Sequence, residues 1–375
     1  MTAVVGWDIG GANIKAARLD AGRVQVVERA FPIWRDPQRL PAVLAETAAR
    51  LGHVRTMAVT MTAELADCFA TKRDGVGSVL DAFRTAFPDV EPRIYGVDGR
   101  FRSADDARGC PLQVAAANWM ASAVLVARSF PDAILVDIGS TTTDVIPIVD
   151  GRVVARGRTD PSRLRTGELI YTGSLRTPVC AIARSVRIGG RRHRMAAELF
   201  AVAADVYLWL GHIEAGDYTC DTPDGRGRSR AEAAARLVRM VCADLDMFGD
   251  GYVGDIARHV AGAQVRQIRA GIRQVMRRLG GDCPRMAILA GQGTFLARMA
   301  LEGYGLDVVD CSEALGADAA RSTPAAAVAI LLAEVMAEKG GSRTLRGPYG
   351  PQTGFEDQRH HRAPSFSMRG SRAKP

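Results

Sequence analysis

Short apolar runs separated by glycine-rich turns dominate the start of the chain. Residues 2–9, 14–19 and 24–31 are rich in β-branched and apolar side chains, which is typical of strands. Gly10 and Gly11 interrupt these runs, and a second turn falls at Gly22. The pattern predicts three consecutive strands joined by tight turns, a meander rather than a strand followed by a helix.

Segments with a helical pattern follow this meander, and then the meander restarts. The predicted elements of the first part are helices at 37–51, 76–87 and 112–129 and strands at 56–61 and 93–95. The second meander has predicted strands at 133–138, 145–149 and 153–157, and a loop-rich stretch follows at 163–194. The remaining predicted elements are a strand at 286–290 and helices at 195–210, 230–244, 256–279, 294–301 and 325–337. This order predicts two domains, each with a strand meander at its core.

The two meanders are also related in sequence. WDIGGANIKAARLDAGRV, from Trp7, aligns without a gap with VDIGSTTTDVIPIVDGRV, from Val136, and six of the eighteen pairs are identical. Asp8 aligns with Asp137, and Gly22 aligns with Gly151. The repetition indicates that each domain contributes one copy of the same half-site.

Each copy has the features of a phosphate-binding turn. A glycine-rich turn between two strands leaves backbone N–H groups pointing outward, and such a concavity binds anions. One isolated copy is better explained as a turn capped by aspartate, but two copies in register favour a phosphate site. A carboxylate at the end of each first strand is suited to hold Mg²⁺ against phosphate oxygens, so we expect Asp8 and Asp137 to be metal ligands.

The copies differ where chemistry would require a difference. Lys15 aligns with Asp144, so one copy offers a positive charge and the other a second carboxylate. We expect the catalytic residues to be Asp8, Lys15, Asp137 and Asp144. The expected phosphate-binding residues lie in the two turns and in a GQG sequence after the predicted strand at 286–290: Gly10, Gly11, Asn13, Gly139, Ser140, Thr141, Thr142, Thr143, Gly291, Gln292 and Gly293.

These motifs resemble those of the superfamily of acetate and sugar kinases, heat-shock chaperone ATPases and actin. DIGGANIK is similar to its first phosphate motif, DIGSTTTD to its second and LAGQGTFL to its adenosine motif, and DIGSTTTDV is particularly similar to the hydantoinase A and oxoprolinase branch. The resemblance implies an α/β fold of two ribonuclease-H-like (actin-like ATPase) domains with a cleft between them. The expected boundaries are a first domain at 1–130, a second domain with a helical insertion at 131–323, a helix returning to the first domain at 324–339 and a disordered basic tail at 340–375.

A closer resemblance covers roughly residues 3–337. GWDIGGANIKAA, TMTAELADCF, VDIGSTTTDVIPI, TGELIYTGSLRTPVCAI and CADLDM together resemble the methanofuran-precursor synthase family of the tetrahydromethanopterin-linked one-carbon pathway. This resemblance implies transfer of a furanylmethyl group from its diphosphate to a phenolic acceptor of the tyramine or tyrosine type, with release of pyrophosphate.

In that reaction a carboxylate would take the phenol proton, because a phenol has a pKa of about 10. Asp144 is the preferred base and Glu168 the alternative. Arg176 and Tyr171 either touch the acceptor or belong to a packed loop, which is the preferred interpretation. Glu64 either lines the cleft or caps a helix, and none of the three is counted among the catalytic residues.

Two other functions stay open. An ATP-dependent kinase, or an amidohydrolase of the hydantoinase and oxoprolinase type, would use the same phosphate turns. However, GQG is a short adenosine motif and Asn13 stands where such kinases usually carry Thr or Ser, so the use of ATP is unresolved. A non-catalytic nucleotide-binding assembly protein is the third function. Pyrophosphate, ADP or no acceptor-derived product would distinguish the three.

Composition narrows the possible partners. Seven Arg or Lys and two Asp or Glu lie in residues 340–375, so this segment carries five of the eight net positive charges and the rest is nearly balanced. We therefore expect small-molecule partners and no specific nucleic acid. With no long uncharged apolar stretch and no signal-peptide pattern, we expect no membrane span and a cytoplasmic location. The seven scattered cysteines form no CxxC pair and are expected to be buried thiols. The oligomeric state is left open.

The composition of the last segment leads to a first prediction. Gly, Pro, Ser and Arg dominate after Gly340, and such a segment cannot supply a core. A chain truncated after Gly340 should therefore keep the melting temperature and the catalytic activity of the full chain. A clear fall in melting temperature would show instead that the segment docks on the protein.

Overall fold

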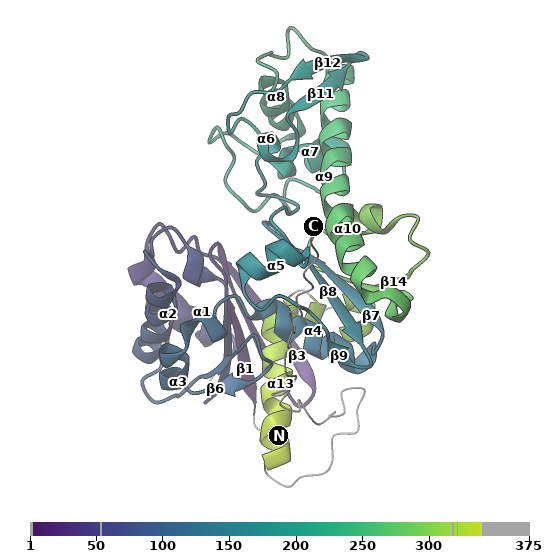
Figure 1. Ribbon diagram of the computed structural model, residues 1–375. Helices are drawn as coiled ribbons and strands as arrows, with labels where there is room; N and C mark the ends of the chain where they lie inside the picture. The colour runs from purple at the N-terminus through teal and green to yellow at the C-terminus, as the bar shows by residue number, and fades with distance from the viewer. Residues whose placement is uncertain (1–2, 53–54, 317–318, 321, 340–375) are drawn as a thin grey trace, which may run out of the picture.

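Two sheets of similar construction form the centre of the protein (Figure 1). The computed structural model describes residues 3–52, 55–316, 319–320 and 322–339, and the predicted tail lies outside these residues. The first sheet has the order β3-β2-β1-β4-β5-β6. Its strands are β1 (Val4–Ile9), β2 (Asn13–Asp20), β3 (Arg23–Ala30), β4 (Thr56–Met61), β5 (Arg93–Tyr95) and β6 (Phe101–Arg102).

The second sheet repeats the central part of the first. Its order is β10-β8-β7-β13-β14, with β9 also paired to β8. Its strands are β7 (Ala133–Ile138), β8 (Thr143–Val149), β9 (Arg152–Val153), β10 (Leu169–Ile170), β13 (Met286–Ala290) and β14 (Asp307–Asp310). In both sheets the first strand pairs antiparallel with the second and parallel with a strand from much later in its domain.

The turn after each second strand confirms that the two meanders are equivalent. Ala21 and Gly22 have φ values of 48° and 80°, and the aligned Asp150 and Gly151 have values of 50° and 70°. Two successive positive φ values are characteristic of the tight turn that matches the twist of a hairpin. The sequence repeat is therefore a repeat of backbone conformation.

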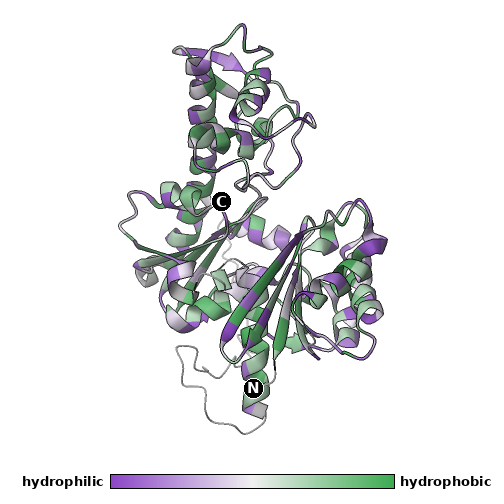
Figure 2. Cartoon of the chain, turned by 180° about the vertical axis from the view of Figure 1, so that it is seen from behind, coloured by the Kyte–Doolittle hydropathy of each residue, from purple (hydrophilic) through white to green (hydrophobic). Residues whose placement is uncertain are grey.

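Helices separate and cover the two sheets (Figures 1 and 2). The helices of the first domain are η1 (Pro37–Arg39), α1 (Leu40–Ala49), η2 (Ala63–Leu65), α2 (Lys72–Ala86), α3 (Ala104–Gly109), η3 (Pro111–Gln113) and α4 (Asn118–Ser129). Those that follow are α5 (Asp160–Thr166), α6 (Val179–Ile182), α7 (Ala203–Leu210), α8 (Arg230–Arg239), α9 (Asp250–Leu279), η4 (Gly280–Asp282), α10 (Thr294–Leu301), α11 (Cys311–Leu315) and α13 (Thr323–Lys339).

Three large apolar clusters define the layers. One joins the outer face of the first sheet to α1 and α2. The second joins the inner faces of both sheets to α4 and α13, which lie between them. The third joins the outer face of the second sheet to α9 and α10, and it continues into a lobe formed by α6, α7, α8 and the hairpin of β11 (Ser185–Ile188) and β12 (Arg191–Arg194).

Close packing of α13 on the first sheet depends on Gly6. This helix contacts β1, β2, β4 and α4, although it comes last among the described elements. A Cβ atom added at Gly6 would lie 2.0 Å from the carbonyl oxygen of Ala325 and 2.8 Å from the backbone nitrogen of Ala329. The absence of a side chain at Gly6 therefore lets an alanine-rich helix face approach the strand directly.

Several predicted elements are shorter in the structure. The predicted helix at 112–129 is η3 followed by α4, because Ala116 takes a φ of 49° between them. The predicted helix at 195–210 is reduced to α7, whose start is fixed by the bond from Val202 N to the Asp205 side chain. The predicted strand at 153–157 ends at Val153, since the Arg156 and Gly157 N–H groups donate to the Glu168 carboxylate instead of a neighbouring strand.

The cysteine prediction is partly wrong. All seven cysteines are free, but only Cys311 is buried, and Cys68, Cys242 and Cys283 are exposed. Their positions on the surface follow from loops and helix ends, which the spacing of cysteines does not reveal.

Replacement of Gly6 by alanine tests the packing of α13. The added methyl group would overlap backbone atoms, which cannot rotate away, so Gly6→Ala should destabilise the protein by about 1–3 kcal/mol. Thermal unfolding measures the effect, and Gly216→Ala is the matched control because a Cβ there meets nothing within 4 Å. Equal melting temperatures for the two variants would contradict the close approach.

Candidate active site

Strand periodicity places four predicted site residues between the two sheets. Side chains alternate between the faces of a strand. In β1, Trp7 and Ile9 belong to the outer cluster and Val4 to the inner one, so Asp8 shares the inner face. In β7, Ile134 and Ile138 are outer, whereas Ala133 and Leu135 are inner. Asp137 therefore also points into the space between the sheets.

The second strand of each hairpin adds one charged residue to the same face. Asp8 is the direct cross-strand partner of Lys15, and Asp137 is the direct partner of Asp144. Ala17 and Ile146, which share faces with Lys15 and Asp144, belong to the inner cluster. The structure thus brings together Asp8, Lys15, Asp137 and Asp144, one pair from each copy of the repeat.

The pKa values of the two aspartates reflect charges from both pairs. Burial raises the pKa of Asp8 to about 6, against the opposing effect of Lys15. Burial also raises the pKa of Asp137 to about 7, with further increases from Asp144 and Asp8 and a decrease from Lys15. Because Lys15 and Asp8 act on Asp137, charges from one hairpin reach the other.

Lys15 is held loosely. Its Nζ lies 3.7 Å from Oε1 of Glu28 on the neighbouring strand β3, and both side chains are partly exposed. Ion pairs of this kind contribute little stability, so an anionic ligand can take Lys15 away from Glu28 at small cost.

Equivalent hydrogen bonds close the two glycine-rich turns. Gly10 N donates to Asn13 O at 3.0 Å, and Gly139 N donates to Thr142 O at 3.0 Å. These two N–H groups are therefore used by the turns themselves. Gly10 also needs its lack of a side chain, because a Cβ there would lie 2.8 Å from Asn13 O.

Residues 172–176, the TGSLR segment, shape the second turn. This segment ends at Arg176, one of the two residues considered for contact with the acceptor. Ser174 N donates to Gly139 O at 2.9 Å, and the N–H groups of Leu175 and Arg176 donate to Ser140 O at 3.1 and 2.8 Å. A Cβ at Gly173 would lie 2.5 Å from Thr141 N. The TGSLR segment is thus packed directly on the turn at Ser140 and Thr141. In the sequence, the glycine at position 173 is the only sign of this close contact.

Thr143 has a different role from its neighbours. Its hydroxyl is buried and donates to Thr172 O at 2.7 Å. Thr143 lies on the outer face of β8 with Val145, so its side chain fixes the TGSLR segment and does not point between the sheets. Thr141 and Thr142 are partly exposed, as phosphate-binding side chains would be.

The GQG motif lies beside Asp137. Gly293 N donates to Ile138 O at 2.9 Å. A Cβ at Gly291, whose φ is 79°, would lie 2.5 Å from Oδ1 of Asp137. Gln292 is exposed between the two glycines. The motif therefore reaches the end of β7 and belongs to the same site as the turns.

The two carboxylates considered as bases have different surroundings. Oδ1 of Asp144 accepts a hydrogen bond from Nη2 of Arg163 at 2.7 Å, and the Arg163 guanidinium stacks over Trp119. Glu168 is fully buried; it accepts from Arg156 N, Gly157 N and Thr166 Oγ1 and pairs with Arg278. Because these bonds give the Glu168 carboxylate a structural role, Asp144 is the better candidate for the base.

Glu64 lies where the two domains meet. It is 1% exposed, and its Oε1 lies 3.2 Å from Nζ of Lys72, which also pairs with Asp160 of the second domain at 2.5 Å. Its Oε2 has no hydrogen-bond partner in the part of the chain that the structure describes. Burial raises the pKa of Glu64, while Lys72 lowers it and Asp160 raises it. Glu64 thus lines the interface between the domains.

The donor set fits Mg²⁺. Two carboxylates from facing hairpins are available, and Oδ1 of Asp8 is buried without a hydrogen-bond partner among the described residues. In the described ranges, no group of three or more His, Cys, Asp and Glu could hold a metal ion. Two protein carboxylates suit Mg²⁺, which commonly completes its coordination with water and substrate phosphate. Asp8 and Asp137 are the residues that would hold it.

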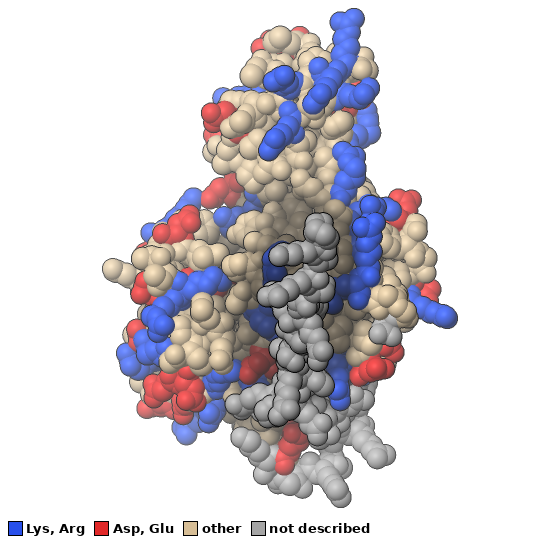
Figure 3. All heavy atoms as spheres, viewed as in Figure 1, with Lys and Arg blue, Asp and Glu red and all other residues tan. Residues whose placement is uncertain are grey.

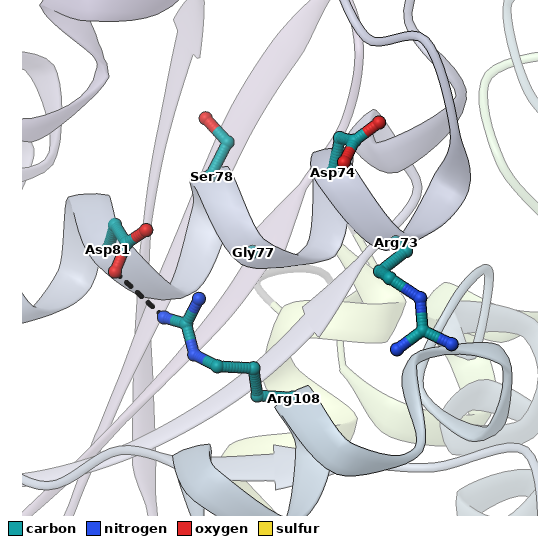
Figure 4. Close-up of a pocket in the computed structure, with 6 residues that line it drawn as sticks. All are labelled: Arg73, Asp74, Gly77, Ser78, Asp81 and Arg108. Atoms are coloured by element: carbon teal, nitrogen blue, oxygen red, sulfur yellow. Dashed lines mark hydrogen bonds and ion pairs between the residues drawn. The ribbon is translucent and has the colours of Figure 1, made fainter.

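Other surface features lie outside this group of residues. Basic side chains are spread along α9 and are interspersed with acidic ones elsewhere on the face seen in Figure 3. A hollow of about 580 Å³ on α2 and α3 is lined by Arg73, Asp74, Gly77, Ser78, Asp81 and Arg108 and shares no residue with the turns (Figure 4). Among the helices that the structure describes, none has the length and apolar character needed to cross a membrane.

The paired sheets and doubled hairpins define a protein with the actin-like ATPase fold. The chain is similar to a solved, nucleotide-free structure of acetone carboxylase, an enzyme of ATP-dependent acetone carboxylation. The TM-score is 0.52 at 10% sequence identity, and the aligned part covers 86% of this chain and 70% of the carboxylase chain. That likeness supports the fold alone. The chain belongs to the hydantoinase/oxoprolinase family, whose model matches residues 55–339.

Two relatives carry the same name, (4-{4-[2-(gamma-L-glutamylamino)ethyl]phenoxymethyl}furan-2-yl)methanamine synthase. The protein of Methanocaldococcus jannaschii is 37% identical over 330 residues, which cover 88% of this chain and 97% of that protein. The protein of Methanococcus vannielii is 33% identical over 203 residues, which cover 53% of this chain and 90% of that protein.

The raised pKa values of Asp8 and Asp137 predict an unusual pH dependence of stability. An unfolded aspartate has a pKa of about 3.9, so between about pH 4 and 7 the native state binds more protons than the unfolded state and loses stability as the pH rises. Asn does not titrate. At about pH 8 without divalent ions, the free energy of unfolding of Asp137→Asn should therefore exceed that of the unsubstituted protein by at most about 4 kcal/mol, and its melting temperature should be higher. Near pH 4 the two proteins should be equally stable.

Added Mg²⁺ should reverse this difference. At about pH 8 it should raise the melting temperature of the unsubstituted protein and have little effect on Asp8→Asn or Asp137→Asn, because a ligand stabilises only the state that binds it. The exposed Asp89→Asn is the control. If Mg²⁺ stabilised the unsubstituted protein and both site variants equally, the assignment of these ligands would be wrong.

Proposed function

We propose that this protein is an enzyme that transfers a furanylmethyl group from its diphosphate to a phenolic acceptor of the tyramine or tyrosine type, with release of pyrophosphate, in the biosynthesis of a methanofuran-type cofactor. The similarity to the M. jannaschii synthase, which extends over nearly the full length of that protein, supports this activity. The relative's name describes a product in which a phenoxymethyl group is attached to a furan, so an aryl ether joins the two parts.

The observation that carries the proposal is the cluster of Asp8, Lys15, Asp137 and Asp144 between two turns of phosphate-binding type. Two turns facing each other suit a ligand with two linked phosphates, which each turn can contact from its own side. This arrangement binds a diphosphate without requiring an adenine pocket.

The proposed reaction begins at the bond between the furanylmethyl carbon and the diphosphate. This C–O bond breaks, and its electron pair goes to the diphosphate oxygen. Lys15, Thr141 and Thr142 would bind the charge that develops there, and backbone N–H groups of the turns would add to it. When bound at Asp8 and Asp137, Mg²⁺ would neutralise charge on the leaving group.

The phenol oxygen then forms the new C–O bond and gives up its proton. Asp144 is the proposed base, with Arg163 holding its Oδ1 in position. Glu64, which the sequence analysis left outside the catalytic residues, is an alternative because its Oε2 is unpaired among the described residues. Neither assignment alters the overall balance: the products are the aryl ether, pyrophosphate and one proton.

An ATP-dependent activity is the second candidate. The chain belongs to the hydantoinase/oxoprolinase family and has the fold of the ATP-dependent acetone carboxylase. GQG lies beside Asp137, where it would contact a nucleotide phosphate equally well. An assembly protein of the actin type has no comparable support from the relatives.

Product and ligand analysis separates these functions. With an aminomethyl-furanylmethyl diphosphate and tyramine, we expect pyrophosphate to be released in proportion to ether formed, and no ADP to be produced from added ATP. In titration calorimetry with Mg²⁺, pyrophosphate should bind at least as tightly as ATP. Pyrophosphate binding weaker than ATP binding by about tenfold, or roughly 1.4 kcal/mol, together with ADP release, would favour the kinase or amidohydrolase.

A further inference from the structure

An arginine from the second domain covers the face of a tryptophan from the first. The guanidinium carbon of Arg176 lies 4.8 Å from the centroid of the Trp34 ring. Both residues are partly exposed. Beside this stack, Nη2 of Arg35 pairs with Oδ2 of Asp221 at 2.7 Å, so two neighbouring residues of the loop after β3 contact the second domain.

Each member of the stack is anchored to one phosphate turn. Trp34 follows Ile33, whose N–H donates to Gly11 O in the first turn at 3.0 Å. Arg176 itself donates its backbone N–H to Ser140 O in the second turn at 2.8 Å. The stack is therefore formed by side chains that start beside the two turns and meet across the gap between them.

The position of the stack matches the chemistry proposed for the site. A guanidinium is a planar, delocalised cation, and its location shows that the Trp34 face is available to such a group. A furanylmethyl carbon that is losing a diphosphate becomes part of a planar, delocalised cation as well. The group that carries this charge is attached directly to the diphosphate, so it must lie next to the turns.

We propose that the face of Trp34 stabilises the positive charge that develops on the furanylmethyl group, and that Arg176 leaves this face to pair with the departing diphosphate. This inference rests on the proposed function. In the step concerned, the carbon–oxygen bond to the diphosphate breaks and the electron pair stays on the diphosphate oxygen. The phenol oxygen forms the new bond and releases its proton to the base, so Trp34 and Arg176 are unchanged at the end.

The electrostatic part of the proposal is tested by fluorination of Trp34. Each fluorine weakens the negative potential of the indole face while the ring keeps its shape. With mono-, di- and trifluorotryptophan incorporated at position 34 of the full chain, kcat for ether formation should fall stepwise, and the acceptor KM should stay constant. Trp34→Leu should lower kcat by about tenfold, equivalent to roughly 1.4 kcal/mol.

The role of Arg176 has a separate readout. Arg176→Ala should weaken binding of pyrophosphate with Mg²⁺ by about tenfold in titration calorimetry, and Arg176→Lys should recover part of this loss. Arg230→Ala is the matched control, because Arg230 stacks over Trp209 in the lobe at 4.3 Å in the same manner but touches neither turn. It should change neither kcat nor pyrophosphate binding.

A structural role in closing the domains predicts other results. Asp221→Asn breaks the neighbouring contact without altering an aromatic face, so it should leave kcat unchanged if the proposal holds. A kcat that is insensitive to fluorination, or an equal loss in Asp221→Asn and Trp34→Leu, would overturn it. If the unsubstituted protein releases pyrophosphate but kcat is the same in all fluorinated variants, only this inference is refuted. Unsubstituted protein that releases ADP in place of pyrophosphate refutes the proposed function and the inference with it.

Discussion

The register of the two hairpins is the constraint on which the rest of the site depends. Asp8 opposes Lys15 and Asp137 opposes Asp144, and strand alternation sends all four side chains to the inner faces. A slip of one residue in either hairpin would move its charged pair into an outer apolar cluster. The positive-φ turns at Gly22 and Gly151 fix this register from the far end of each hairpin.

Helix α13 supports the first hairpin, and the TGSLR segment supports the second. The helix packs against β1 through the space left by Gly6, and the segment packs on the second turn through the space left by Gly173. Both contacts bring backbone against backbone, so each leaves little freedom for a nearby strand or turn to shift. In the first turn, the carbonyl oxygens of Ala12 and Gly11 accept hydrogen bonds from the N–H groups of Phe31 and Ile33.

Local patterns in the sequence predicted the hairpins because periodicity and turn chemistry are local properties. Asp8, Lys15, Asp137 and Asp144 could all be placed on this basis, and β4, β5, β13 and α10 have the predicted bounds. The environment of the site could not be predicted in this way. Pairing of Asp144 with Arg163, occupation of Glu168 by two backbone N–H groups and stacking of Trp34 under Arg176 each depend on how distant segments pack. Gly173 can be read from the sequence, but its close packing against Ser140 and Thr141 cannot.

The divergence of the two copies makes the charges of the site asymmetric. In the first hairpin an aspartate lies opposite a lysine. In the second hairpin the aspartate lies opposite another aspartate, Asp144, which forms an ion pair with Arg163. A gene duplication would have produced two interchangeable halves, between which an elongated ligand could lie either way round. With Lys15 on one side and Asp144 on the other, the two orientations of an anionic ligand differ in energy. The replacement of one charge thus converts a symmetric binding space into one that distinguishes the head of its ligand from the tail.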